Sequence, residues 1–149
     1  MIDVDTPLRL LAGVGVTFLM GLERSRRIPS VGARTFGMIG LAGATAALTS
    51  VHYGGADPAL LGRVLQGVLM GVGFVGAGVI MHRACRQSLH GVTTAAAIWV
   101  AALVGFAAGL ADWPLLVGAA VLSILLLMLP EPLQAGGRSK AAPRADQGG

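Results

Sequence analysis

One uncharged stretch decides the fold: VLQGVLMGVGFVGAGVIMH, from Val64 to His82. A helix needs about 18 to 20 such residues to cross the ~30 Å hydrocarbon layer of a membrane. The stretch also contains Gly71, Gly73 and Gly76 in the GxGxxG pattern of a dinucleotide-binding turn. That turn requires a preceding strand and an acidic residue about 20 positions later, but the next acidic residue here is Asp112. The stretch therefore predicts a membrane helix, and we expect no bound cofactor.

Four further uncharged runs accompany this one, at Leu10–Leu22, Thr35–Ala56, Gln87–Ala111 and Trp113–Pro130. The 149 residues are 54% hydrophobic and 12% charged, whereas soluble proteins contain about 25% charged residues. Such a chain cannot cover itself with polar surface. The sequence predicts an all-α, polytopic membrane helical bundle of about five transmembrane helices, at Leu8–Leu22, Phe36–Tyr53, Leu61–Met81, Thr94–Leu110 and Leu115–Leu129.

The orientation follows from lysine and arginine, which are retained on the cytoplasmic side of short loops. If the N-terminus lies outside, nine of the 11 basic residues face the cytoplasm, and the C-terminus is cytoplasmic. No basic residue precedes Arg9, so we expect the first helix to stay in the membrane rather than to be a cleaved signal. Residues 1–130 are expected to form the membrane domain, and residues 131–149 a disordered, basic tail.

Small residues recur at the spacing that lets membrane helices pack closely. They form Gly-xxx-Gly or similar patterns in the first, third and fourth predicted helices. In lipid, close backbone contact between such residues is a main source of helix association. Because the third helix is the richest in them, from Gly67 to Gly78, we expect it at the centre of the bundle. A broken helix around Gly71–Gly78 is left open, since irregular backbone is tolerated where it is buried in protein.

Charged residues near the helix ends are the next candidates. Arg9 must lie below the outer surface, where it either snorkels to water or pairs with Asp57 or Asp112. Glu23 closes the first helix and is four residues from Arg27, the spacing of a helical ion pair. Arg24, Arg26 and Arg34 are expected to remain available for lipid phosphate or a partner.

Three other sets of polar residues are candidates for a metal site, a helix cap and a hydrogen bond between helices. His82, Cys85 and His90 have the spacing of zinc ligands, but the sequence lacks a fourth cysteine or histidine beside them, so we expect no metal. Thr93 or Thr94 can cap the fourth helix. Trp99 lies about 9 Å inside that helix by its rise, and its indole N–H should find a partner on another helix.

Four segments together resemble a known family. They read RLLAGVGVTFLMGLERSRR, VGART, QGVLMGVGFVGAGVIM and HGVTTAAAIWVAALVGFAAGL, and in the same order and spacing they are similar to the membrane domain of the MgtC/SapB family of bacterial inner-membrane proteins. The positions that match the family motifs are Gly21, Leu22, Glu23, Arg24, Gly32, Arg34, Thr35, Gly73, Gly76, Ala77, Gly78, Val79, Ile80, Gly91, Thr93, Thr94, Ala95 and Trp99. The candidate functional residues among these positions are Glu23, Arg24, Gly32, Arg34, Thr35, Gly73, Gly76, Gly78, Gly91, Thr93, Thr94 and Trp99, and we add Arg9 and Gly71.

The sequence also departs from the family pattern. Ala33 replaces the usual leucine of the second motif, and HRACRQSLH, from His82 to His90, is basic where relatives often carry an acid. Many relatives add a cytoplasmic C-terminal domain, whereas this sequence continues into its tail.

The resemblance implies a multi-pass protein of the bacterial inner membrane that is tied to growth in low magnesium and, in pathogens, to virulence. It implies action on other integral membrane proteins, such as ATP synthase or a transporter. Membrane lipids are expected partners, a homo-oligomer is left open, and no nucleic acid is expected. The sequence contains no P-loop or nucleophile motif, and its spans hold no internal carboxylate of the kind that Mg²⁺ prefers. We therefore expect a non-enzymatic regulator; the alternatives are a small transporter of Mg²⁺, protons or a solute, and a binder of anionic lipids.

Overall fold

The computed structural model describes residues 4–27, 31–55, 57–84 and 91–129, and every regular element in these ranges is a helix. The helices are α1 (Asp5–Arg27), α2 (Ala33–Gly54), α3 (Pro58–Ala84), α4 (Gly91–Gly109) and α5 (Trp113–Met128). The prediction of an all-helical membrane bundle is confirmed. The predicted tail, residues 131–149, lies outside the described residues.

Three of the described helices are long and apolar enough to cross a membrane: Asp5–Arg26, Pro58–Met81 and Gly91–Gly109. The apolar helix α5 has 16 residues, about 24 Å by helical rise. The helices begin two to three residues before the predicted starts, because polar and proline-containing first turns such as that of Pro58 still adopt helical geometry. The count of five spans and the outward N-terminus remain predictions.

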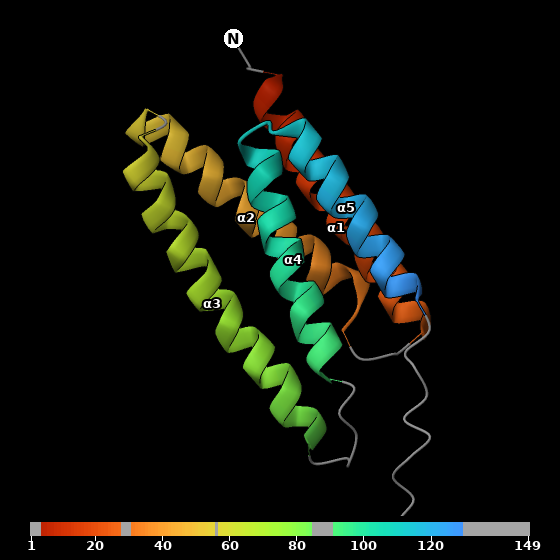
Figure 1. Ribbon diagram of the computed structural model, residues 1–149. Helices are drawn as coiled ribbons and strands as arrows, with labels where there is room; N and C mark the ends of the chain where they lie inside the picture. Colours follow the sequence, from red (N-terminus) through yellow and green to blue (C-terminus); the bar gives the residue numbers. More distant parts are fainter. Residues whose placement is uncertain (1–3, 28–30, 56, 85–90, 130–149) are drawn as a thin grey trace, which may run out of the picture.

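The turns that join the helices follow from local chemistry. Gly55, at φ 63°, ends α2 in the left-handed conformation and donates its N–H to the Val51 carbonyl at 3.0 Å. Ala111 takes the same conformation, at φ 59°, between α4 and α5. Asp112 then caps α5 by accepting a hydrogen bond from the Leu115 N–H at 3.1 Å. These short connections hold the joined ends of α2 and α3, and of α4 and α5, next to each other (Figure 1).

The centre of the bundle is α4, not α3. In its most apolar stretch 67% of the residues are buried, against 6% in α3. Figure 1 shows α4 between α3 and α5, with α2 crossing behind it. The prediction that the third helix forms the centre is therefore wrong, because most of its glycines point away from the other helices. The helix is also continuous from Pro58 to Ala84, so a break at Gly71–Gly78 is excluded.

The backbones of α2 and α4 approach each other closely where the two helices cross. A Cβ atom added at Gly105 of α4 would collide with the carbonyl oxygen of Gly40 on α2, and one at Gly43 would collide with the Ala102 carbonyl. Helix α1 packs against α2 in the same way, since a Cβ at Gly40 would lie 2.6 Å from the Gly13 carbonyl oxygen. The two backbones touch because no side chain separates them, which is how membrane helices gain packing energy without a hydrophobic driving force.

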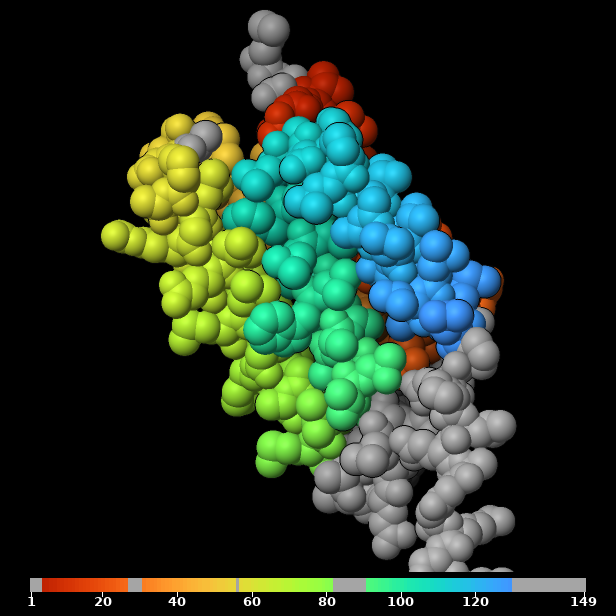
Figure 2. All heavy atoms as spheres, viewed as in Figure 1, coloured from red at the N-terminus to blue at the C-terminus, as the bar shows by residue number. Residues whose placement is uncertain are grey.

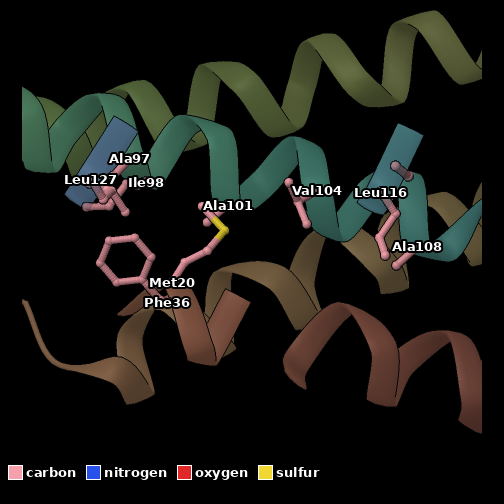
Figure 3. Packing of buried hydrophobic residues seen from close by; sticks show 10 residues of the cluster. Met20, Phe36, Ala97, Ile98, Ala101, Val104, Ala108, Leu116 and Leu127 are labelled. Carbon is pink, nitrogen blue, oxygen red and sulfur yellow. The ribbon is translucent and has the colours of Figure 1, made fainter. Parts of the chain in front are cut away.

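Larger side chains fill the remaining space of the core. Met20 of α1, Phe36 of α2 and Ile98 of α4 are fully buried, and Figure 3 shows them converging on the face of α4. The residues of α4 on this face are mostly alanines, which explains how the helix can be covered from several sides at once.

Candidate functional site

A buried arginine joins α1 to α4. The Arg24 side chain is 3% exposed, and its Nε and Nη2 donate to Thr94 Oγ1 at 3.2 and 3.0 Å. Thr94 is fully buried in the first turn of α4. Because an unpaired buried charge is costly, a guanidinium is found in such a place only when polar groups surround it. Arg24 and Thr94 are thus brought together as a fixed polar contact at one end of the bundle.

The other motif residues near Arg24 are less buried. Glu23 is partly buried, and Thr93 is exposed beside Thr94. Neither threonine acts as the predicted cap, because α4 already begins at Gly91; Thr94 instead accepts hydrogen bonds from Arg24. The predicted pair of Glu23 with Arg27 involves a side chain outside the described part of the structure.

A second arginine joins the same two helices at their other ends. Arg9 forms an ion pair with Asp5, one turn away in α1, and its Nη1 donates to the Gly109 carbonyl oxygen at 3.2 Å. Its buried Nε has no hydrogen-bond partner among the residues that the structure describes. The predicted pairs with Asp57 or Asp112 are wrong, because these two carboxylates accept backbone N–H groups at the starts of α3 and α5.

The two arginine contacts share one register. Arg9 precedes Arg24 in α1 by the same number of residues as Thr94 precedes Gly109 in α4. The helices therefore run antiparallel, held at both ends, with the contacts about 22 Å apart by helical rise. Between them the contact is made by small and apolar residues, such as Gly13 against Ala108.

The residues of the second family motif, Gly32, Arg34 and Thr35, lie at the start of α2. Gly32 precedes the helix, and its carbonyl oxygen accepts the Thr35 N–H at 3.0 Å. Arg34 and Thr35 are exposed. They lie at the same end of the bundle as Arg24, since a short connection joins α1 to α2 (Figure 1).

The glycine-rich motif of α3 divides between two faces. A Cβ at Gly76 would lie 3.4 Å from the Ala95 Cβ, and one at Gly73 would lie 3.6 Å from the Trp99 ring. Gly71 and Gly78 meet nothing within 4 Å. One pair therefore seats α3 on α4, and the other faces away from the protein.

Trp99 fills the contact between α3 and α4. It remains 41% exposed, and its indole N–H has no acceptor among the described residues. The prediction of a hydrogen bond to another helix is wrong for this part of the chain. The ring borders a groove that Gln66, Leu69 and Met70 also line.

The described residues hold no group of three or more histidine, cysteine or acidic side chains that could bind a metal ion. Of the zinc-ligand candidates, His82 has its backbone in α3 but its side chain outside the described part of the structure, and Cys85 and His90 lie outside the described residues altogether. The described carboxylates, Asp5, Glu23, Asp57 and Asp112, all lie near helix ends.

Comparison with known proteins shows which family the chain resembles. The model of the MgtC family matches residues 10–135. SrpB of Synechococcus elongatus is 37% identical over 117 residues, which cover 72% of this chain and 64% of that protein. YhiD of Escherichia coli K12 is 35% identical over 129 residues, covering 80% and 58%. MgtC of Salmonella typhimurium is 34% identical over 106 residues, covering 71% and 44%.

The chain thus matches less than two thirds of the length of these relatives. No solved structure matches it significantly.

Proposed function

Since the chain belongs to the MgtC family, a family of membrane proteins related to Mg²⁺ adaptation, we propose that it is a non-enzymatic regulator in the bacterial inner membrane. It acts when magnesium is limiting, by packing one of its helices against another integral membrane protein. The residues of α3 that face away from the bundle form the docking surface. A transporter or ATP synthase is the class of partner that the family resemblance suggests.

The observation that carries this proposal is the outer face of α3. Three of its glycines, Gly67, Gly71 and Gly78, have open space where a side chain would be. Phe74, on the same face, is 84% exposed. In Figure 2 this helix forms one edge of the molecule, with α4 beside it.

Small residues on a lipid-facing helix lower the cost of close approach by a second helix, as they do at the crossing of α2 and α4 within this bundle. The Phe74 side chain protrudes between these glycines, so a partner must provide space for its ring. The outer face of α3 therefore has the same chemistry as the buried contacts, but none of the described residues packs against its glycines.

The charges of the bundle support a regulator over a dedicated magnesium pore. The described carboxylates lie near helix ends, and the buried polar contact of Arg24 with Thr94 links two helices. Mg²⁺ favours an octahedral set of carboxylate and water oxygens, and no such set lies inside the described helices.

The proposal is tested by affinity capture after cross-linking in cells grown in low magnesium. Gly71→Leu places a bulky side chain on the outer face of α3 and should remove the captured membrane partner. Gly118→Leu is the matched control, since Gly118 of α5 also has nothing within 4 Å. If both variants capture the same partners as the original chain, the docking surface is not on α3.

Transport is the second candidate, because the name of the Escherichia coli relative YhiD proposes magnesium transport. In this hypothesis, which rests on the sequence, Glu23 or Arg9 contacts the ion, and the glycines of α3 line its path. Purified chain in liposomes separates the two: a transporter raises Mg²⁺ or proton flux above that of empty vesicles, and a regulator does not.

A further inference from the structure

A narrow cavity lies between α1, α4 and α5, near the end of the bundle that holds Arg24. Its volume is about 180 Å³. It is lined mainly by apolar side chains, and the residues that carry the argument are Met20, Thr93, Ala96, Val100, Ser123 and Leu127. Figure 3 shows Leu127 of α5 beside Ala97 of α4, another lining residue, at one end of the buried cluster.

The shape of the cavity selects an extended chain rather than a helix. Its lining runs along α4 from Thr93 to Val100, about 10 Å by helical rise. A helix about 11 Å across would occupy roughly 950 Å³ over that length, several times the volume present. The cavity is partly open to the surface, since Ala96 and Leu126 are exposed. A single hydrocarbon chain fits a narrow, apolar space that opens toward lipid.

The charge beside the cavity is positive. Met20 precedes Arg24 by one helical turn on the same face of α1, and Thr93 adjoins Thr94, the acceptor of Arg24. Arg26 is exposed in the last turn of α1, and Arg34 is exposed at the start of α2. Of the charged side chains that the structure describes at this end, three are arginines and one, Glu23, is acidic. Cationic side chains near a membrane surface attract anionic headgroups.

We propose that this cavity binds one anionic phospholipid of the surrounding bilayer. An acyl chain enters between α4 and α5, past Thr93 and Ala96. The headgroup phosphate lies at the end of α1, where Arg26 supplies the exposed positive charge. This site is separate from the outer face of α3, so lipid binding and partner docking can each fail without the other.

The test is retention of lipid by the full chain, measured by native mass spectrometry after purification from bilayers with equal amounts of phosphatidylglycerol and phosphatidylcholine. The original chain should retain phosphatidylglycerol in preference. Ala96→Trp fills the cavity and should reduce the retained phosphatidylglycerol at least fivefold. Ala77→Trp is the matched control, because Ala77 is an exposed alanine on α3, and it should leave retention unchanged.

Arg26→Gln tests the charge at an exposed position where folding is not at stake. It should weaken phosphatidylglycerol retention about fivefold, the effect of one arginine near an anionic surface, and leave phosphatidylcholine unaffected. The proposal is overturned if the original chain shows no preference for phosphatidylglycerol, or if Ala96→Trp and Arg26→Gln both retain it as the original chain does.

Discussion

Arg24 and Thr94 are both buried, and two nitrogens of the arginine donate to the one hydroxyl oxygen of the threonine. The contact links the end of α1 to the start of α4, the central helix. Because the bundle has little polar interior among its described residues, this contact fixes how α1 lies against α4 in both register and rotation.

Thr94→Val tests the contribution of this contact to stability. Valine preserves the shape of the side chain but removes the acceptor, so the Nε and Nη2 groups of Arg24 lose their hydrogen bonds to Thr94 in a buried position. We expect the free energy of unfolding to fall by about 1–3 kcal/mol, measured by denaturation in mixed micelles. Thr35→Val, at an exposed position, should leave it nearly unchanged.

The same pair can be tested by a double-mutant cycle. In an Arg24→Met background, Thr94→Val should cost clearly less than it does alone, because the group that needs the hydroxyl is gone. Equal costs in the two backgrounds would show that the two residues are not energetically coupled.

The crossing of α2 over α4 predicts an unusually severe effect of a single methyl group. Gly105→Ala would drive its Cβ into the Gly40 backbone, whose Cα would lie 2.7 Å away. We expect a loss of stability of about 1–3 kcal/mol, typical of overpacking. Gly118→Ala adds the same methyl group in open space and should not destabilise the protein. Similar stabilities for the two variants would contradict this helix crossing.

Two glycines of α3 make a matched comparison. Gly76→Leu pushes a side chain against Ala95 and Trp99 and should separate α3 from α4. Gly71→Leu faces away from the bundle and should leave folding intact while it removes partner docking. The emission spectrum of Trp99, recorded in a Trp113→Phe background, reports the contact of α3 with α4, because the Trp99 ring lies beside Gly73 and Gly76. A changed spectrum in Gly71→Leu, or an unchanged spectrum in Gly76→Leu, would place the two faces differently.

The helices were predictable from hydropathy, because runs of apolar residues with prolines at their ends leave few other solutions in lipid. It was harder to predict which face of each helix packs within the bundle and which faces away from it. The glycines of α3 have the spacing of a packing motif, but spacing alone does not say whether the contact is made within the chain or outside it. The many alanines of α4 were the better signal of a central helix, since a helix without large side chains can be approached from several directions.

The candidate site was predictable only in part. Arg24, Thr93 and Thr94 were selected from the family resemblance, but the pairing of Arg24 with Thr94 depends on the antiparallel register of α1 and α4. The ion pair of Arg9 with Asp5 could have been found, because the two residues are four apart in the sequence. The sequence alone does not favour Asp5 over the acidic residues of the other loops, because the end of the bundle at which each carboxylate meets Arg9 depends on the helix packing.

The central claim, that the outer face of α3 binds another integral membrane protein, is tested most directly by a photo-cross-linking amino acid at Phe74 in living cells. Val121 of α5, which is also exposed, is the control position. We expect position 74 to form an adduct with a membrane protein other than this chain, and position 121 to form none. No adduct from position 74, an adduct only with a second copy of the chain, or the same adduct from both positions would contradict it.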